Sequence, residues 1–432
     1  MHSFRYRDGQ LHCENVDLGR VAEKFGTPLY VYSAGTILDH YHRLDAALAP
    51  FDHLIGYAVK ANSNRSILKL LAEAGAGFDI VSGGELYRVL AAGGDPARCT
   101  FAGVGKSREE IEYALEKRVY SFNVESEAEL DYIDKIAGAK NLRAPIALRA
   151  NPDVDPHTHD YISTGSRENK FGIALDRIAA VYERAASMRN IEIVGIQMHI
   201  GSQITEAAPF ADAIKKVVPI VRDLKSKYGI KFFSVGGGLG IVYESSFESG
   251  AKEWWDSRTH KSKSLSIQQY VDAILPSLRE LKLKILLEPG RLLVGNAGVL
   301  LTRVRYVKRT GAKKFAIVDA GMNDLIRPAL YHSYHEIVPV REPNNPACEK
   351  IDVVGPVCES GDFFALDREM PEMREGDLLA IMSAGAYGFV MASNYNSRPL
   401  PAEAIVRRDK FALIRKRQPI EDLVRDEIDP QW

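Results

Sequence analysis

The sequence predicts an α/β protein in which a (β/α)8 TIM-like barrel is joined to a second, all-β domain of Greek-key or sandwich-like type. Short β-rich runs alternate with helical patterns from about residue 53 to 290, and polar residues and glycines gather where those runs end. From about residue 297 the expected strands follow one another without helices between them. This order is typical of a barrel followed by a β domain. We expect the barrel to span residues 28–296 and the β domain to combine residues 1–27 and 297–432.

The composition suits two such domains and excludes several other classes of protein. The chain has 432 residues, of which 46% are hydrophobic and 26% charged, so a large core is possible. A formal net charge of -1 gives no basic field for nucleic acid or anionic lipid. No stretch is typical of a signal peptide or approaches the roughly 18 apolar residues of a membrane span, so we expect a cytoplasmic protein. The four cysteines lack CxxC spacing, which argues against a zinc ribbon or a disulfide framework.

Eight apolar or β-branched runs are the expected barrel strands. Helical patterns lie between them, such as the spacing of Ile67, Leu68 and Leu71 after the first run. Eight strand–helix units over this length suit a closed barrel better than an open sheet. The expected strands are residues 54–60, 77–81, 99–104, 119–124, 145–150, 193–200, 231–236 and 284–288.

Polar residues and glycines fall at the carboxyl ends of these strands. In barrels of this type the reactive groups lie on that face, so this distribution indicates a functional rim. The residues are Lys60, Asp79, Ser82, Gly103, Gly105, Asn123, Glu125, Arg149, Asn151, His199, Gly201, Ser202, the glycines at 236–238, Glu288, Gly290 and Arg291.

Lys60 is the most informative of these residues, because it ends an apolar run and is expected to lie partly buried. Burial disfavours the ammonium form and lowers the pKa of the amine. A free lysine with a pKa near 10.4 is deprotonated in only roughly one molecule in 2,500 at pH 7. A site that bonds covalently to a carbonyl cofactor therefore benefits from this placement. The alternative is a lysine whose ammonium group simply reaches solvent from the strand end.

The glycine run 236–238 follows an apolar strand and suits a phosphate, because consecutive glycines let backbone N–H groups approach an anion. A tight structural turn is the alternative. The run is not a dinucleotide fingerprint, since Ile241 stands where the third glycine is needed. The segment 105–107 is not a Walker A loop either, because Thr100 replaces its first glycine.

Three further residues on the same rim suit a planar cofactor. Glu288, facing a pyridine nitrogen, would keep that nitrogen protonated and make the ring an electron sink. An ion pair between Glu288 and Arg291 is the alternative. His199 offers a flat imidazole for stacking and Ser202 a hydroxyl for a phosphate, although a lone histidine is more often a structural residue.

The β domain adds candidate substrate ligands. Arg327 and Tyr331 are four residues apart and share a face if the segment is helical, which places a guanidinium and a phenol where they suit a carboxylate. Cys358 stands beside Glu359 in a loop, where a buried inert thiol is the alternative. Tyr387 lies in a glycine-rich turn and can reach a phosphate oxygen. We expect no metal, because the histidine pairs lack HExxH context and a third ligand.

Taken together, these motifs resemble the fold-type III pyridoxal phosphate-dependent decarboxylases. The resemblance covers residues 25–405 or so, and the longer loop 241–264 is its chief departure. It implies pyridoxal 5'-phosphate as cofactor and a homodimer with shared active sites. The motifs that carry it are residues 57–62, 78–85, 199–203, 236–238, 288–291, 327–331, 358–359 and Tyr387.

The resemblance also assigns roles. It implies that Lys60 bonds the cofactor, that His199 stacks on the ring, and that Cys358 is the proton donor, supplied to the neighbouring subunit's site. The implied cofactor-binding residues are Lys60, Asp79, His199, Ser202, Gly237, Gly238, Glu288, Gly290, Arg291 and Tyr387. The implied substrate-binding residues are Arg291, Arg327, Tyr331, Glu359 and Tyr387.

The expected reaction is decarboxylation of meso-2,6-diaminopimelate to L-lysine and CO2, the last step of lysine biosynthesis. Arg291 and Arg327 can bind a second carboxylate while Glu359 binds the second amine. The alternatives are an ornithine, arginine or lysine decarboxylase of the same fold, and a non-catalytic regulator on that scaffold. A racemase would usually place an arginine, rather than Glu288, near the ring nitrogen.

Overall fold

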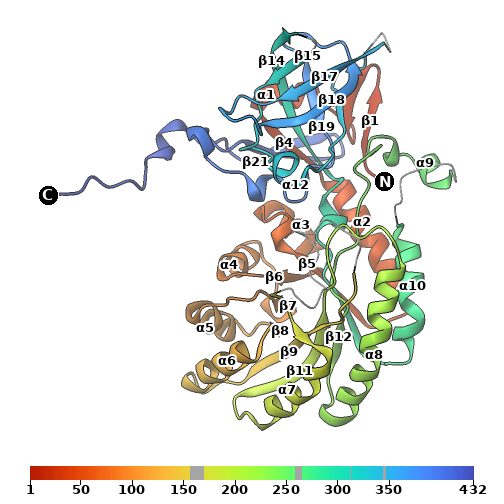
Figure 1. Ribbon diagram of the computed structural model, residues 1–432, viewed down its shortest axis with the longest axis vertical. Coiled ribbons are helices and arrows are strands. Elements are labelled where there is room, and N and C mark those ends of the chain that lie inside the picture. The colour runs from red at the N-terminus through yellow and green to blue at the C-terminus, as the bar shows by residue number, and fades with distance from the viewer. Residues whose placement is uncertain (156–169, 258–264, 312, 344–346) are drawn as a thin grey trace. The chain divides into compact units, whose positions relative to one another are not determined.

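The computed structural model describes residues 1–155, 170–257, 265–311, 313–343 and 347–432. The chain divides into two compact units (Figure 1). We call the described residues of Leu38–Ile241 and Lys263–Leu293 the barrel unit. Those of Met1–Ile37, Val242–Ser262 and Val294–Trp432 form the β unit.

The barrel unit contains a closed ring of eight parallel strands, which confirms the predicted barrel. The strands pair in chain order, and the ring closes where β13 pairs with β5. A short additional strand, β10 (Ile173–Ala174), extends the edge of β9. The ring strands are β5 (His53–Ala58), β6 (Gly77–Ile80), β7 (Cys99–Phe101), β8 (Ser121–Val124), β9 (Ala144–Asn151), β11 (Ile191–Met198), β12 (Phe232–Ser234) and β13 (Lys284–Leu287).

Helices follow the ring strands and surround them (Figure 1). Their starts are fixed by side-chain caps: Ser82 accepts from the N–H of Glu85, and Ser107 forms a capping box with Glu110. Their apolar faces are buried against the strands, as at Ile67 in α3 (Arg65–Glu73). The helices are α2 (Ala34–Leu48), α3 (Arg65–Glu73), α4 (Gly83–Ala91), α5 (Arg108–Lys117), α6 (Glu127–Ala139), α7 (Leu175–Ser187), α8 (Ala208–Tyr228), α10 (Ile267–Arg279) and α11 (Arg291–Val294).

The first ring strand ends earlier than the sequence predicts. β5 stops at Ala58, and Lys60 lies in a 3-10 turn, Val59–Ala61, instead of in the strand. The N–H of Ala58 donates to the carbonyl of Pro289 at 3.0 Å. The ends of β5 and its neighbour β13 are thereby tied together, and Lys60 stands on the rim just beyond them.

The β unit is mostly β, as predicted for the second domain. Its larger sheet runs β18-β17-β15-β14-β4-β20-β21, with β16 and β19 joined beside β14. A three-stranded sheet, β1-β2-β3, packs into the same apolar core, to which Leu11, Val31 and Val299 contribute. The strands are β1 (Phe4–Arg7), β2 (Gln10–Cys13), β3 (Val16–Asp17), β4 (Leu29–Ser33), β14 (Gly298–Thr310), β15 (Lys313–Val318), β16 (Ile337–Pro339), β17 (Cys348–Val354), β18 (Phe363–Pro371), β19 (Leu378–Ile381), β20 (Ala402–Arg407) and β21 (Lys410–Arg415).

Three short helices complete the β unit: α1 (Leu18–Phe25), α9 (Lys252–Asp256) and α12 (Arg327–Tyr331). Helix α9 belongs to the long loop 241–264, of which residues 258–264 lie outside the described residues. Within the described part of the chain, no helix combines the length and hydropathy that crossing a membrane requires.

Candidate active site

The predicted rim residues of the barrel unit lie together at the carboxyl ends of its strands. Lys60 Nζ lies 2.8 Å from Oδ2 of Asp79, which belongs to the neighbouring strand β6. The side chain of Lys60 is 40% exposed, whereas that of Asp79 is 1% exposed. Lys60 is therefore partly exposed and forms an ion pair with a buried carboxylate, whereas the sequence predicts an amine desolvated at the end of a strand.

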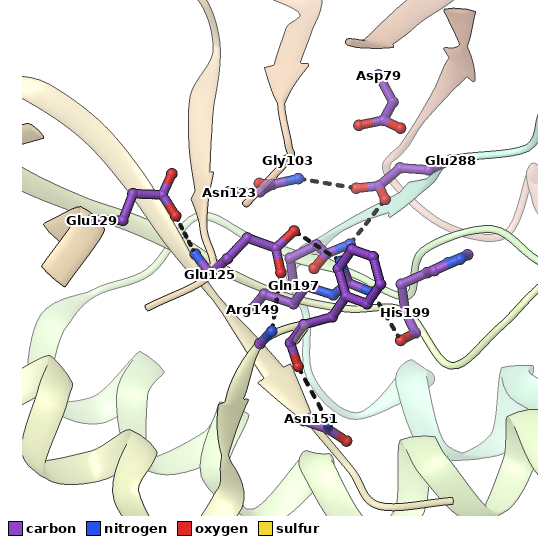
Figure 2. A network of polar contacts seen from close by, with 12 residues as sticks. Asp79, Gly103, Asn123, Glu125, Glu129, Arg149, Asn151, Gln197, His199 and Glu288 are labelled. Carbon is purple, nitrogen blue, oxygen red and sulfur yellow. Dashed lines mark hydrogen bonds and ion pairs between the residues drawn. The ribbon is translucent and has the colours of Figure 1, made fainter. Parts of the chain in front are cut away.

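Glu288 is buried just beyond β13 and accepts hydrogen bonds from three neutral donors on other strands. Figure 2 shows the bonds from Asn123 and Gln197. Ser234 Oγ and Asn123 Nδ2 donate to its Oε1 at 2.7 and 3.3 Å, and Gln197 Nε2 donates to its Oε2 at 2.9 Å. Burial, together with the negative charge of Asp79, raises the pKa of Glu288 to about 7. The site therefore holds a carboxylate with an unusually strong affinity for a proton, fixed in orientation from three sides.

His199, just beyond β11, is a neutral imidazole. Burial, followed by the charges of Arg149 and Lys60, holds the pKa of His199 well below its ordinary value. Its Nδ1 accepts a hydrogen bond from the N–H of Gly237 at 3.2 Å. A neutral ring held in this way is suited to stacking on a planar molecule, as the sequence predicts.

The backbone of the glycine run packs so closely against neighbouring strand ends that it leaves no room for a side chain. A Cβ atom on Gly237 would lie 2.1 Å from the carbonyl oxygen of Glu288, and one on Gly238 would lie 2.3 Å from that of Gly201. Gly238 also has a φ of 106°, which favours glycine. The backbone N–H groups of the run thus lie at the same rim as Lys60, His199 and Glu288.

Arg291, at the start of α11, donates from Nη2 to Ser202 Oγ at 3.0 Å. This bond joins the loop after β11 to the loop after β13. Gly290, the residue before Arg291, packs against Ala61, where a Cβ would lie 2.9 Å from the alanine methyl group. The guanidinium group therefore binds the loop that carries the predicted phosphate ligand, while neutral donors bind Glu288.

A second group of polar side chains lies beside His199 (Figure 2). Arg149 donates to Glu125 Oε1 at 2.8 Å and to the carbonyl of His199 at 3.4 Å. Glu125 also accepts from the N–H of Gly172 at 3.0 Å, and the guanidinium lies 4.8 Å from the centre of the Phe171 ring. These contacts fix the backbone from which the imidazole projects.

The remaining predicted residues lie in the β unit. Arg327 and Tyr331 lie on the predicted helix, now α12, and the guanidinium is 5.7 Å from the centre of the Tyr331 ring. Cys358 is exposed, so its interpretation as a buried inert thiol is wrong. Glu359 is also exposed, and Tyr387 lies in its glycine-rich turn with a φ of 56°.

Comparisons with known proteins place this chain in a family. A model described as the pyridoxal binding domain of pyridoxal-dependent decarboxylases matches residues 34–295. Diaminopimelate decarboxylases from Pseudomonas aeruginosa and Vibrio cholerae are 50% and 49% identical to the chain, over 98% of the chain and 98% of each relative. The chain belongs to the diaminopimelate decarboxylase family. A crystal structure of the Helicobacter pylori diaminopimelate decarboxylase complexed with L-lysine is similar, with a TM-score of 0.87, 42% identity, and coverage of 95% of this chain and 98% of that chain.

The rim residues of this family member fit pyridoxal phosphate. Asp79 Oδ1 and Gln197 Oε1 are buried acceptors that receive no hydrogen bond from the described residues, so polar atoms are directed toward the site. Glu288 offers a carboxylate of raised pKa for a ring nitrogen. Within the glycine loop, Gly238 offers a backbone N–H for a phosphate, and Ser202 offers a hydroxyl.

Several site residues of this family member were not predicted. Gln197 and Ser234 bond to Glu288, yet each lies within an apolar strand and gives no signal in the sequence. Asn123 and Arg149 stand at strand ends and were noted there, but without a role. A polar residue near the carboxyl end of a strand is the signal that the sequence offers for both.

Proposed function

We propose that this protein removes CO2 from meso-diaminopimelate and releases L-lysine, with pyridoxal phosphate as its cofactor. The supporting observation is the placement of Lys60 and Glu288 just beyond the ends of β5 and β13, two neighbouring strands of the ring. An amine for the cofactor aldehyde and a carboxylate for its ring nitrogen then stand on one rim, beside a neutral imidazole and a glycine run.

The barrel unit would hold the cofactor. Lys60 would bond its aldehyde, His199 would stack on its ring, and Glu288 would keep a proton on its ring nitrogen, which the raised pKa of about 7 favours. When bound, pyridoxal phosphate supplies an acceptor for the electron pair left behind by CO2. Asp79 holds a proton at Lys60 Nζ, 2.8 Å away. Glycines 237, 238 and 290, Ser202, Arg291 and Tyr387 complete the set of cofactor ligands in this proposal.

Five residues would bind the substrate and one would protonate it. Two guanidinium groups suit the distal carboxylate of diaminopimelate, and the carboxylate of Glu359 suits its distal ammonium. Cys358 would donate a proton to the substrate α-carbon after CO2 leaves. The proposed substrate ligands are Arg291, Arg327, Tyr331, Glu359 and Tyr387.

The proposal includes a homodimer with shared active sites. Cys358 and Glu359 are exposed, as they must be if they enter the site of a second subunit. Two-fold symmetry would then give each barrel the thiol and carboxylate of the other subunit. The four cysteines are free, which suits a reducing compartment, and we infer a cytoplasmic location.

A comparison of four substrates tests the proposal. The purified protein, loaded with pyridoxal phosphate, is incubated separately with meso-diaminopimelate, ornithine, arginine and lysine, and released CO2 is measured. We expect the highest kcat/KM for diaminopimelate, with L-lysine as product. Preference for ornithine would replace the proposed substrate, and no turnover of any of the four would favour a non-catalytic protein.

A further inference from the structure

We infer that Tyr395 is a further specificity-determining residue, which positions Glu359 to bind the distal ammonium group of the substrate. The inference rests on the proposed function, because that function makes Glu359 a substrate ligand. It goes further by naming a residue that acts through the carboxylate of Glu359.

The first observation is a direct bond between the two side chains. Tyr395 Oη donates to Glu359 Oε2 at 2.7 Å, although the residues are far apart in the sequence and both are exposed. The bond to Glu359 raises the pKa of Tyr395, so the phenol remains a donor at neutral pH. The phenol thus holds one carboxylate oxygen of Glu359, and the other oxygen, Oε1, can accept a hydrogen bond from an ammonium group.

The residues adjacent to Tyr395 and Glu359 form a second hydrogen bond. The backbone N–H of Cys358 donates to Oδ1 of Asn396 at 2.9 Å. Residues 395–396 therefore hold residues 358–359 by two adjacent hydrogen bonds. Asn396 and Ser397 have φ values of 55° and 52°, a region that serine seldom adopts. This costly backbone conformation occurs where the phenol and the amide face the Cys358 loop.

The supporting segment is itself anchored within the β unit. The N–H of Ser393 donates to the carbonyl of Asn323 at 2.9 Å, and Arg398 donates to Asn323 Oδ1 at 3.2 Å and to the carbonyl of Asp319 at 2.7 Å. These bonds attach residues 393–398 to the loop that leads into α12, where Arg327 lies. The segment that holds Glu359 is thus tied to the loop that leads to Arg327, one of the two proposed ligands for the distal carboxylate.

The Cys358 loop is also held from its other side. The carboxylate of Asp362, which is buried, accepts from the N–H groups of Val357 and Met322, both at 2.6 Å. With its backbone fixed, the remaining freedom of Glu359 lies in its long side chain. Tyr395 removes much of that freedom, so less conformational entropy is lost when an ammonium group binds.

The test compares ligands with and without an ammonium group beside the distal carboxylate. L-lysine carries it, and 6-aminohexanoate lacks it while keeping the carboxylate and the terminal amine. For Tyr395→Phe we expect KM for meso-diaminopimelate to rise about five- to tenfold, as for loss of one charge-assisted hydrogen bond. The dissociation constant of L-lysine, measured by calorimetry on the holoenzyme, should rise by a similar factor. The dissociation constant of 6-aminohexanoate should stay within about twofold of its wild-type value.

Two further variants complete the experiment. Tyr306→Phe, at a tyrosine on β14 that is 64% exposed, is the matched control and should behave as wild type. In a Glu359→Gln background, Tyr395→Phe should add no further loss, because its effect acts through that carboxylate. Unchanged lysine binding in Tyr395→Phe, or equal weakening of both ligands, would overturn the inference. Failure of the proposed function is seen separately, as a wild-type enzyme that does not turn over diaminopimelate.

Discussion

At the scale of single residues, the environment of Lys60 differs from what the sequence indicates. An apolar run predicts a desolvated amine, but the strand ends at Ala58 and the following turn carries Lys60 out to the rim. The groups that are removed from water are instead the carboxylates of Asp79 and Glu288, which are buried. The shifted pKa values of the site therefore belong to Glu288 and His199.

The pKa of Glu288 predicts how stability depends on pH. Its folded-state pKa of about 7 lies above the ordinary value of 4.5, so its favourable contribution is complete below about pH 4.5 and is lost as the pH rises through about 7. We expect the unfolding free energy of the cofactor-free wild type to fall by about 2 to 3 kcal/mol, relative to Glu288→Gln, between about pH 5 and 8. Chemical denaturation of both proteins at each pH measures this, and parallel pH profiles would show that the pKa is not raised.

At the scale of elements, the glycine run leaves no room for a larger side chain. Gly237→Ala places a methyl group against the backbone of Glu288, which is fixed by the adjoining strand. We expect the affinity for pyridoxal phosphate to fall at least about tenfold and the unfolding free energy to fall by about 2 kcal/mol or more. Equilibrium dialysis and denaturation measure the two effects.

Gly105→Ala is the matched control for this prediction. Gly105 lies in the loop after β7, and a Cβ there would meet nothing within 4 Å. The affinity of this variant for pyridoxal phosphate and its unfolding free energy should match those of the wild type. Equal losses in both variants would show that the close packing of Gly237 is not the cause.

The elements also show how far sequence reasoning reaches. The sequence predicts all eight ring strands, because each is an apolar or β-branched run and helical patterns, some with a clear start such as Ser107, separate the runs. Strand ends were less accurate, since the 3-10 turn at Lys60 leaves no mark in hydropathy. Gln197 and Ser234 could not be predicted as ligands of Glu288, because only closure of the ring brings their strands beside it.

At the scale of the whole molecule, the proposed dimer predicts that damaged subunits rescue one another. A Lys60→Ala subunit lacks the amine of its own barrel, and a Cys358→Ala subunit lacks the thiol that it gives to its partner. A heterodimer of the two has one site with both defects and one intact site, so we expect about half of the wild-type activity per dimer. Coexpression with two affinity tags and purification through both yields this species.

The control heterodimer combines Lys60→Ala with Glu288→Gln. Both changes lie in barrels, so each site carries one defect and activity should stay near that of the single variants. Rescue in both heterodimers, or in neither, would contradict shared sites built from the barrel of one subunit and the Cys358 loop of the other.

The central claim is that the amine of Lys60 carries the cofactor. Borohydride reduction of the holoenzyme, followed by digestion and peptide mass spectrometry, fixes the cofactor to whichever lysine holds it. We predict the added mass of the reduced cofactor on the peptide that contains Lys60, and no labelled peptide in Lys60→Ala. Labelling of another lysine, such as the buried Lys106 at the same rim, would contradict the account.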